Sequence, residues 1–186
     1  MTAPETLRDA EQKMRGAVSV TQEDLGSIRT GRANPKLLDR ITVDYYGAQV
    51  SLRELASFSV PEPRLLVIQP HDRNAIAGME RAIMSSDLGL TPSNDGNVIR
   101  LSFPALTEER RKELIKLARD RAEEGRVSVR NVRRHAKDTL ERLEREHSIS
   151  EDDLRRSEKD LQRLTDQYVG EIDTLLEHKE KELSEV

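Results

Sequence analysis

The chain has 186 residues, of which 35 % are charged, 35 % are hydrophobic and only 3 % are aromatic, and its formal net charge is −4. It contains no Cys, which excludes disulfides, thiolate metal sites and a cysteine nucleophile. It also contains no Trp. The longest apolar run covers residues 65–68 and is too short to span a membrane. The N-terminal residues include no hydrophobic signal region, so we expect a cytoplasmic protein.

A helix is predicted for residues 2–29, because apolar and small side chains recur there at steps of three and four. The predicted apolar stripe consists of Leu7, Ala10, Met14, Ala17, Thr21, Leu25 and Ile28. Gly31 and Pro35 follow this segment. Glycine is the usual residue past a helix end, so we expect the helix to end before Gly31.

Residues 33–104 are typical of a small mixed α/β module, since they contain short β-like segments and six of the seven prolines of the chain. We expect strands near residues 41–45, 58–60, 65–68 and 98–101, and a short amphipathic helix over residues 74–86. Tyr45 ends the first of these segments, and Tyr46 follows it directly. Because side chains alternate along a strand, one tyrosine is expected to face the core and the other the solvent.

Two further helices are predicted after Pro104 and Ala105. The first starts after Thr107, a plausible N-cap, and runs for about 40 residues without proline. Its expected apolar stripe is Ile115, Ala118, Ala122, Gly125, Val129, Val132, Ala136, Leu140 and Leu143. Gly125 lowers helix propensity, so this helix is expected to be softer in its middle. The last helix begins near Ser150 and presents Leu154, Leu161, Leu164, Tyr168, Ile172, Leu175 and Leu183.

The order of these elements predicts an α+β fold, in which a long three-helix bundle carries an inserted small β/α/β domain. The bundle should comprise residues 1–30 plus 105–186, and the inserted domain residues 31–104. The chain would cross between the two domains twice, through short segments that contain Gly31 and Pro104. Two short crossings of this kind are expected to form a hinge.

The distribution of charge is uneven. Residues 110–145 contain 13 Lys and Arg against 7 Asp and Glu, whereas residues 146–186 contain 6 against 13. On the second long helix a heptad register aligns Lys112, Arg119, Arg126 and Arg133, and a neighbouring row holds Lys116, Glu123, Arg130 and Lys137. Seven of these eight positions are cationic, so they form a basic stripe beside the apolar one.

Two explanations of the basic stripe are open. Its cations could pair with acids of the third helix, for which Asp152, Asp153, Glu158 and Asp160 are candidates. Alternatively, arginines along a rigid helix match a run of phosphates, and the absence of aromatic residues from the stripe favours structured RNA over single strands. The first explanation would make the chain a helical scaffold or coiled-coil adaptor. An enzyme acting on nucleic acid is a third possibility, but no acid/base pair in a pocket is evident.

Four segments resemble the bacterial ribosome recycling factor family. They are SIRTGRANPKLLDRITVDYYG (27–47), SSDLGLTP (85–92), LTEERRKEL (106–114) and VRNVRRHAKD (129–138). The resemblance extends over essentially the whole chain. The resemblance implies a three-helix bundle and a β/α/β domain in an L-shaped arrangement that resembles tRNA in outline. It also implies a cytoplasmic, monomeric factor that binds the 70S ribosome after termination. With elongation factor G and GTP, such a factor splits the ribosome into subunits and releases mRNA and tRNA.

The resemblance also implies roles for individual residues. Arg130 and Arg133 would be the central contacts to large-subunit rRNA. The complete set of expected rRNA-binding residues is Arg29, Arg32, Arg110, Arg126, Arg130, Arg133 and Arg134. The expected interdomain joints are Gly31, Arg32, Pro104 and Ala105.

We expect no catalytic or metal site and no cofactor. The four histidines are scattered along the chain, and none has a second histidine at metal-binding spacing. No glycine-rich loop carries the Lys-Ser/Thr pair of a phosphate-binding motif, so GTP would be hydrolysed by the partner, elongation factor G.

Overall fold

The computed structural model describes residues 1–185, which divide into two compact units. The first consists of residues 1–29 and 108–185, and the second of residues 30–107. None of the helices among the described residues is both long enough and apolar enough to cross a membrane.

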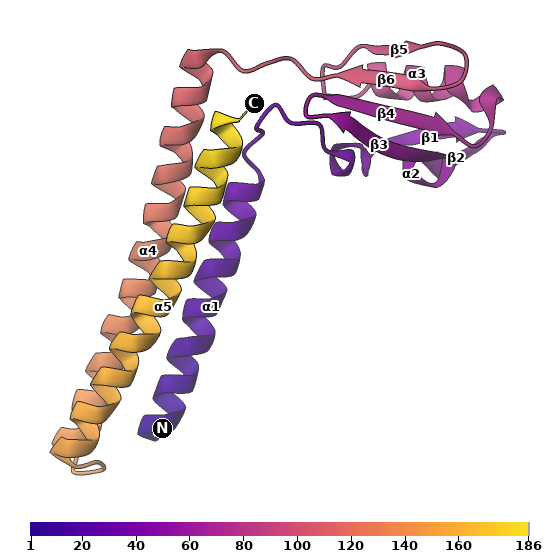
Figure 1. The fold of residues 1–186 in the computed structure, drawn as a ribbon. Helices are drawn as coiled ribbons and strands as arrows, with labels where there is room; N and C mark the ends of the chain where they lie inside the picture. Colours follow the sequence, from indigo (N-terminus) through magenta and orange to yellow (C-terminus); the bar gives the residue numbers. More distant parts are fainter. Residues whose placement is uncertain (186) are drawn as a thin grey trace. The chain divides into compact units, whose positions relative to one another are not determined.

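The first unit is built from three helices, α1 (Ala3–Gly26), α4 (Glu108–Arg145) and α5 (Glu151–Ser184), which lie side by side (Figure 1). Each helix packs against the other two. Their shared core is built mainly from Ala, Leu and Val, together with Met14, Tyr168 and Ile172. The unit is therefore the three-helix bundle predicted from the sequence.

Local sequence explains where these helices begin. Thr2 and Glu5 form a capping box at the start of α1, and Ser150 and Asp153 form another at the start of α5. In each box the hydroxyl accepts a backbone N–H that has no partner within the helix, and the carboxylate accepts the N–H of the capping residue.

The end of α1 differs from the prediction. The helix ends at Gly26, three residues earlier than expected, and Ser27 is its C-cap. Ile28 is nevertheless buried, and its N–H is donated to the Leu25 carbonyl in a tighter turn. The apolar stripe extends past the helix because the side chain of Ile28 stays in the core after the backbone has left α1.

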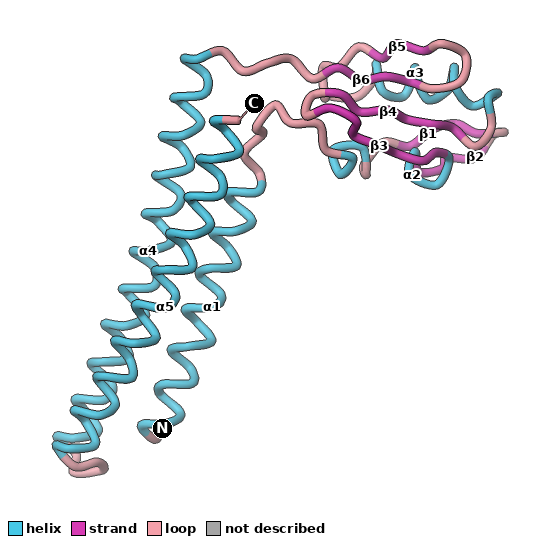
Figure 2. The backbone as a smooth tube through the Cα atoms, viewed as in Figure 1, coloured by secondary structure: helices cyan, strands magenta, loops and turns pink. Residues whose placement is uncertain are grey.

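The second unit contains two antiparallel sheets. A hairpin joins β1 (Thr42–Tyr45) to β2 (Ala48–Ser51), and the larger sheet has the order β3-β4-β6-β5 (Figure 2). The bounds of the larger sheet are β3 Ala56–Glu62, β4 Leu65–Pro70, β5 Pro92–Asn94 and β6 Ile99–Ser102. The helices are α2 (Leu52–Leu55) and α3 (Ile76–Met84), with 3₁₀ turns η1 (Pro35–Leu38) and η2 (Arg73–Ala75).

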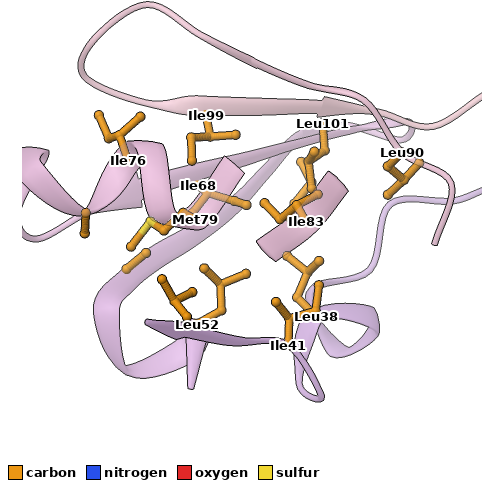
Figure 3. Close-up of a cluster of buried hydrophobic side chains, with 14 of the residues drawn as sticks. Leu38, Ile41, Leu52, Ile68, Ile76, Met79, Ile83, Leu90, Ile99 and Leu101 are labelled. Carbon is orange, nitrogen blue, oxygen red and sulfur yellow. The ribbon is translucent and has the colours of Figure 1, made fainter. Parts of the chain in front are cut away.

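The core of the second unit lies between α3 and the strands. Figure 3 shows Ile76, Met79 and Ile83 of α3 facing the same space as Ile68, Ile99 and Leu101 of the larger sheet. Leu38, Ile41 and Leu52 enclose the same core from the segments around the hairpin. The α+β fold class predicted from the sequence is confirmed.

Both segments that leave the second unit are held at one turn. The N–H of Ala33 is donated to the Pro63 carbonyl, and the N–H of Phe103 to the Arg64 carbonyl, each at 2.8 Å. Ala33 and Phe103 are both buried in the core of this unit. The β3–β4 turn therefore fixes the incoming and the outgoing chain at two adjacent residues.

Candidate nucleic-acid interface

The basic stripe predicted on the second long helix lies on α4, which is continuous over 38 residues. The exact core register differs slightly from the prediction, because Leu114 rather than Ile115 is buried. Gly125 does not interrupt the helix. It is buried where α4 meets Thr21 of α1 and Ile172 of α5. Packing, rather than a soft point in the helix, accounts for this glycine.

Arg126 is a largely enclosed cation of the stripe, with 19 % of its side chain exposed. Its Nε donates to Asp173 Oδ1 on α5 at 2.7 Å, and its Nη1 donates to Glu123 Oε2 at 3.0 Å. Burial works against the charged guanidinium, but the hydrogen bonds to Asp173 and Glu123 together raise the pKa of Arg126. Arg126 is thus tied to the bundle by two carboxylates.

Arg130 shares one of those carboxylates. Its Nη1 donates to Glu123 Oε1 at 3.1 Å, and about half of its side chain remains exposed. Hydrogen bonds from Arg126 and then Arg130 lower the pKa of Glu123, so this carboxylate stays ionised between them. Because Arg130 shares its carboxylate partner with Arg126 and stays about half exposed, its guanidinium can also meet an outside anion.

Arg133 and Arg134 differ from Arg126 because no carboxylate among residues 1–185 pairs with either. Arg133 Nη1 donates to the neutral Gln162 Oε1 on α5 at 3.0 Å. Arg134 is exposed, and neither an ion pair nor a side-chain hydrogen bond to it occurs in the described part of the chain. Across this four-arginine patch, Arg126, Arg130, Arg133 and Arg134, the only carboxylates engaged within residues 1–185 are those of Glu123 and Asp173.

The remaining stripe cations are mostly paired within the bundle. Arg119 donates to Glu180 on α5 at 2.6 Å, and Lys137 lies 3.5 Å from Glu158. Lys112 lies 3.8 Å from Glu108. Of the four acids considered as partners from the sequence, only Glu158 pairs with the stripe. Asp153 instead caps α5 and pairs with Arg156, and Asp160 pairs with Arg163.

The other expected binding residues lie outside this patch. Arg29 is exposed at the end of the first segment of the bundle unit, and Arg110 is exposed on the first turn of α4, 2.9 Å from Glu113. Arg32 is exposed and belongs to the second unit. Of the expected joints, Gly31 has φ 74°, a left-handed conformation that glycine adopts readily, and Pro104 and Ala105 lie between β6 and α4.

Among residues 1–185, no group of three or more His, Asp or Glu side chains is arranged to hold a metal ion. The stripe on α4 presents positive charge and hydrogen-bond donors. Arginine donors along a rigid helix suit the regularly spaced phosphate oxygens of a nucleic acid.

Comparison with known proteins decides the family. The family model described as ribosome recycling factor matches residues 21–183. The chain belongs to the ribosome recycling factor family. This confirms the resemblance found in the sequence, and membership of this family makes the chain a translation factor rather than an enzyme.

Curated relatives match over almost the full length. The ribosome-recycling factor of Thermobifida fusca is 58 % identical over 182 residues, which are 98 % of each chain. The ribosome-recycling factor of Bacillus subtilis is 54 % identical over the same share of both chains.

Two solved structures of the family are also similar. A solution structure of ribosome recycling factor aligns with TM-score 0.75 and 45 % identity over 100 % of this chain and 99 % of the other. The second is the T. thermophilus ribosome recycling factor, which is bound together with E. coli elongation factor G to the E. coli post-termination complex. It aligns with TM-score 0.64 and 45 % identity over 98 % of this chain and 99 % of the other.

Proposed function

We propose that this chain binds the post-termination ribosome and, with elongation factor G and GTP, splits it into subunits, releasing mRNA and tRNA. The proposal rests on the match of residues 21–183 to the ribosome recycling factor family. A member of that family is bound to the post-termination complex together with elongation factor G. The chain would act as a monomer in the cytoplasm, where its ribosomal substrate is, and would need no cofactor of its own.

Large-subunit rRNA is the proposed ligand of the four-arginine patch. Arg133 and Arg134 lack a carboxylate partner among the described residues, and Arg130 shares Glu123 with Arg126. Arg133 and Arg134 therefore carry positive charge that no carboxylate within residues 1–185 compensates, and an RNA backbone would supply the missing anions. Arg126 would contribute mainly by holding this part of α4 against α5. Arg29, Arg32 and Arg110 are proposed as additional contacts outside the patch.

The two chain crossings are proposed to act as the hinge between a bundle domain, residues 1–30 plus 105–186, and an inserted domain, residues 31–104. An L-shaped arrangement of these domains stays a prediction. Ala33 and Phe103 are fixed at the β3–β4 turn, which supports placing the joints at Gly31 and Arg32 on one side and at Pro104 and Ala105 on the other. The hinge freedom would be needed for splitting, after initial binding.

The test is a splitting assay with purified components. Post-termination 70S ribosomes are mixed with the chain, elongation factor G and GTP, and subunit formation is followed by light scattering. We expect rapid splitting only when all three are present. Omission of each component in turn is the control, and a complete mixture that leaves the ribosomes intact would refute the proposed function.

A further inference from the structure

Among the large hydrophobic side chains of the second unit, residues 30–107, Tyr46 is the most exposed, with 78 % of its surface accessible. Its neighbour Tyr45 is half-buried and packs on the core, as expected from strand alternation. Tyr46 has φ 49° and Gly47 has φ 82°, and the two form the loop between the paired residues Tyr45 and Ala48. Positive φ at both central residues is the requirement of a type I′ turn, for which Asn-Gly is the favoured sequence.

A bulky aromatic residue is therefore found where the backbone favours asparagine. The left-handed conformation is unfavourable for tyrosine, and the exposed ring gains little burial in return. Burial of the side chain therefore does not explain why tyrosine occupies this position. Unfavourable backbone conformations that persist in a structure occur preferentially at functional positions.

The Tyr46 ring is also held in a defined orientation. It meets the Tyr45 ring edge to face, with centroids 4.6 Å apart and an interplanar angle of 73°. The two hydroxyls donate to the same oxygen, Asp72 Oδ2, at 2.9 Å from Tyr45 and 3.4 Å from Tyr46. Asp72 is itself fixed, because its Oδ1 accepts the N–H of Asn74. A ring that is exposed but oriented loses little conformational entropy on binding.

The charged groups in contact with this turn favour a protein partner over RNA. Asp72 accepts both tyrosine hydroxyls, and Asp44 Oδ1 accepts the N–H of Gly47 at 3.1 Å. Two carboxylates beside the ring would repel phosphates. They would attract lysine or arginine at the rim of a protein pocket, and tyrosine is among the residues that most often anchor protein interfaces.

We propose that the β1–β2 turn is a protein-docking site whose anchor is Tyr46, and that its partner presents an apolar pocket with a basic rim. This inference rests on the proposed function, in which elongation factor G is the protein that must act together with the chain. We therefore assign the pocket to elongation factor G rather than to the ribosome.

The first experiment compares Tyr46→Asn with wild type in the splitting assay at increasing concentrations of elongation factor G. Asparagine suits the type I′ turn, so the melting temperature should be unchanged or higher. Binding to ribosomes in the absence of the elongation factor should also be unchanged. The concentration of elongation factor G needed for half-maximal splitting should rise about tenfold, as for the loss of an interface anchor.

Two further variants separate the ring from its surroundings. Tyr46→Phe keeps the ring and removes only the hydroxyl, so its requirement for elongation factor G should stay near that of wild type. Met84→Asn is the matched control, because Met84 is another exposed apolar side chain of the same unit, at the end of α3. It should behave as wild type.

The second experiment places the photocrosslinker p-benzoylphenylalanine at position 46 and irradiates purified ribosomes, elongation factor G and the modified chain. A crosslink to elongation factor G supports the proposal, whereas a crosslink to rRNA or to a ribosomal protein overturns it. The proposal would also be overturned if Tyr46→Asn needed the same concentration of elongation factor G as wild type for half-maximal splitting. It would be overturned as well if Tyr46→Asn no longer bound ribosomes in the absence of elongation factor G. If the wild-type chain itself does not split ribosomes, the proposed function fails instead.

Discussion

Gly125 of α4 lies so close to Thr21 of α1 that a Cβ atom at position 125 would collide with the Thr21 hydroxyl oxygen. The same Cβ would lie 3.1 Å from Cδ1 of Ile172 on α5. The three helices of the bundle therefore meet at a point where only a hydrogen atom fits. A glycine that is unfavourable for an isolated helix is required here by the packing of its neighbours.

Gly125→Ala should destabilise the bundle by about 1–3 kcal/mol despite its better helix propensity, because overpacking of a filled core outweighs that gain. Chemical denaturation followed by circular dichroism measures the effect. Gly16→Ala is the control, since a Cβ added to Gly16 on α1 would have no atom of another helix within 4 Å, and it should be stabilising by up to about 1 kcal/mol. Thr21→Ala should recover part of the Gly125→Ala loss. Equal effects of the two glycine substitutions would contradict this packing account.

Arg133→Ala should weaken ribosome binding and flatten its dependence on salt by about one unit of log–log slope per lost phosphate contact. The free energy of unfolding should change by less than about 1 kcal/mol, because within residues 1–185 the Arg133 side chain makes a single hydrogen bond across the bundle, to the exposed Gln162. Affinity measured at several salt concentrations and a thermal melt test the two parts. Arg155→Ala is the control, since Arg155 is an exposed arginine of α5 paired with Glu151. A large fall in melting temperature for Arg133→Ala would instead assign this arginine a structural role.

Insertion of two glycines between Pro63 and Arg64 should reduce splitting by roughly an order of magnitude while leaving ribosome binding largely intact. The insertion separates the two carbonyls that hold Ala33 and Phe103, so the two crossings would no longer start from one fixed place. The rate of splitting and the distribution of distances between fluorophores on the two units are the measurements.

The matched control inserts two glycines between Gly96 and Asn97, in the loop between β5 and β6. Both insertions lengthen a hairpin loop of the same sheet, so they should cost similar stability. If they also reduce splitting equally, the β3–β4 turn has no special role in the hinge.

Stability should fall in acid partly because of the capping box at the start of α5. Hydrogen bonds from the Ser150 side chain and backbone lower the pKa of Asp153. The ionised carboxylate therefore stabilises the fold above the ordinary aspartate pKa of about 3.9, and this contribution is lost as the pH falls through the lower folded-state value. Asp153→Asn should be less stable than wild type at pH 7 and should lose less stability between about pH 4 and pH 2.

The free energy of unfolding measured as a function of pH tests this expectation. Asp152→Asn is the control, because Asp152 lies in the same helical turn and makes no hydrogen bond or ion pair within residues 1–185. Parallel pH profiles for wild type and Asp153→Asn would rule out the contribution of this carboxylate.

Several elements could be predicted from the sequence because their signals are local. The start of α5 follows from Ser150 and Asp153, whose spacing of three is that of a capping box. In contrast, β2, β5 and the short helix α2 were not predicted. Each is only three or four residues long, and a strand of that length forms because a partner supplies its hydrogen bonds, as β6 does for β5.

The candidate site was predictable in part. The position of the basic stripe follows from the helical period, since Arg126 and Arg133 are two turns apart on one face. The helical period does not show which of these cations pair with a carboxylate of another helix. Arg126 is paired with Asp173 on α5, whereas Arg133 meets the neutral Gln162 on the same helix. The two outcomes depend on the register between α4 and α5.

The sequence by itself determined the three amphipathic helices, the basic character of α4 and the family of the chain, because residue periodicity and motifs are properties of the order of residues. Only the tertiary structure decided that Gly125 is a packing requirement, that Ala33 and Phe103 are held by adjacent carbonyls, and that Tyr46 is exposed in a left-handed turn. These relationships join residues that lie far apart in the sequence or depend on a backbone conformation set by strand pairing. They are fixed by close packing and by the pairing of buried N–H groups, neither of which has a local signature.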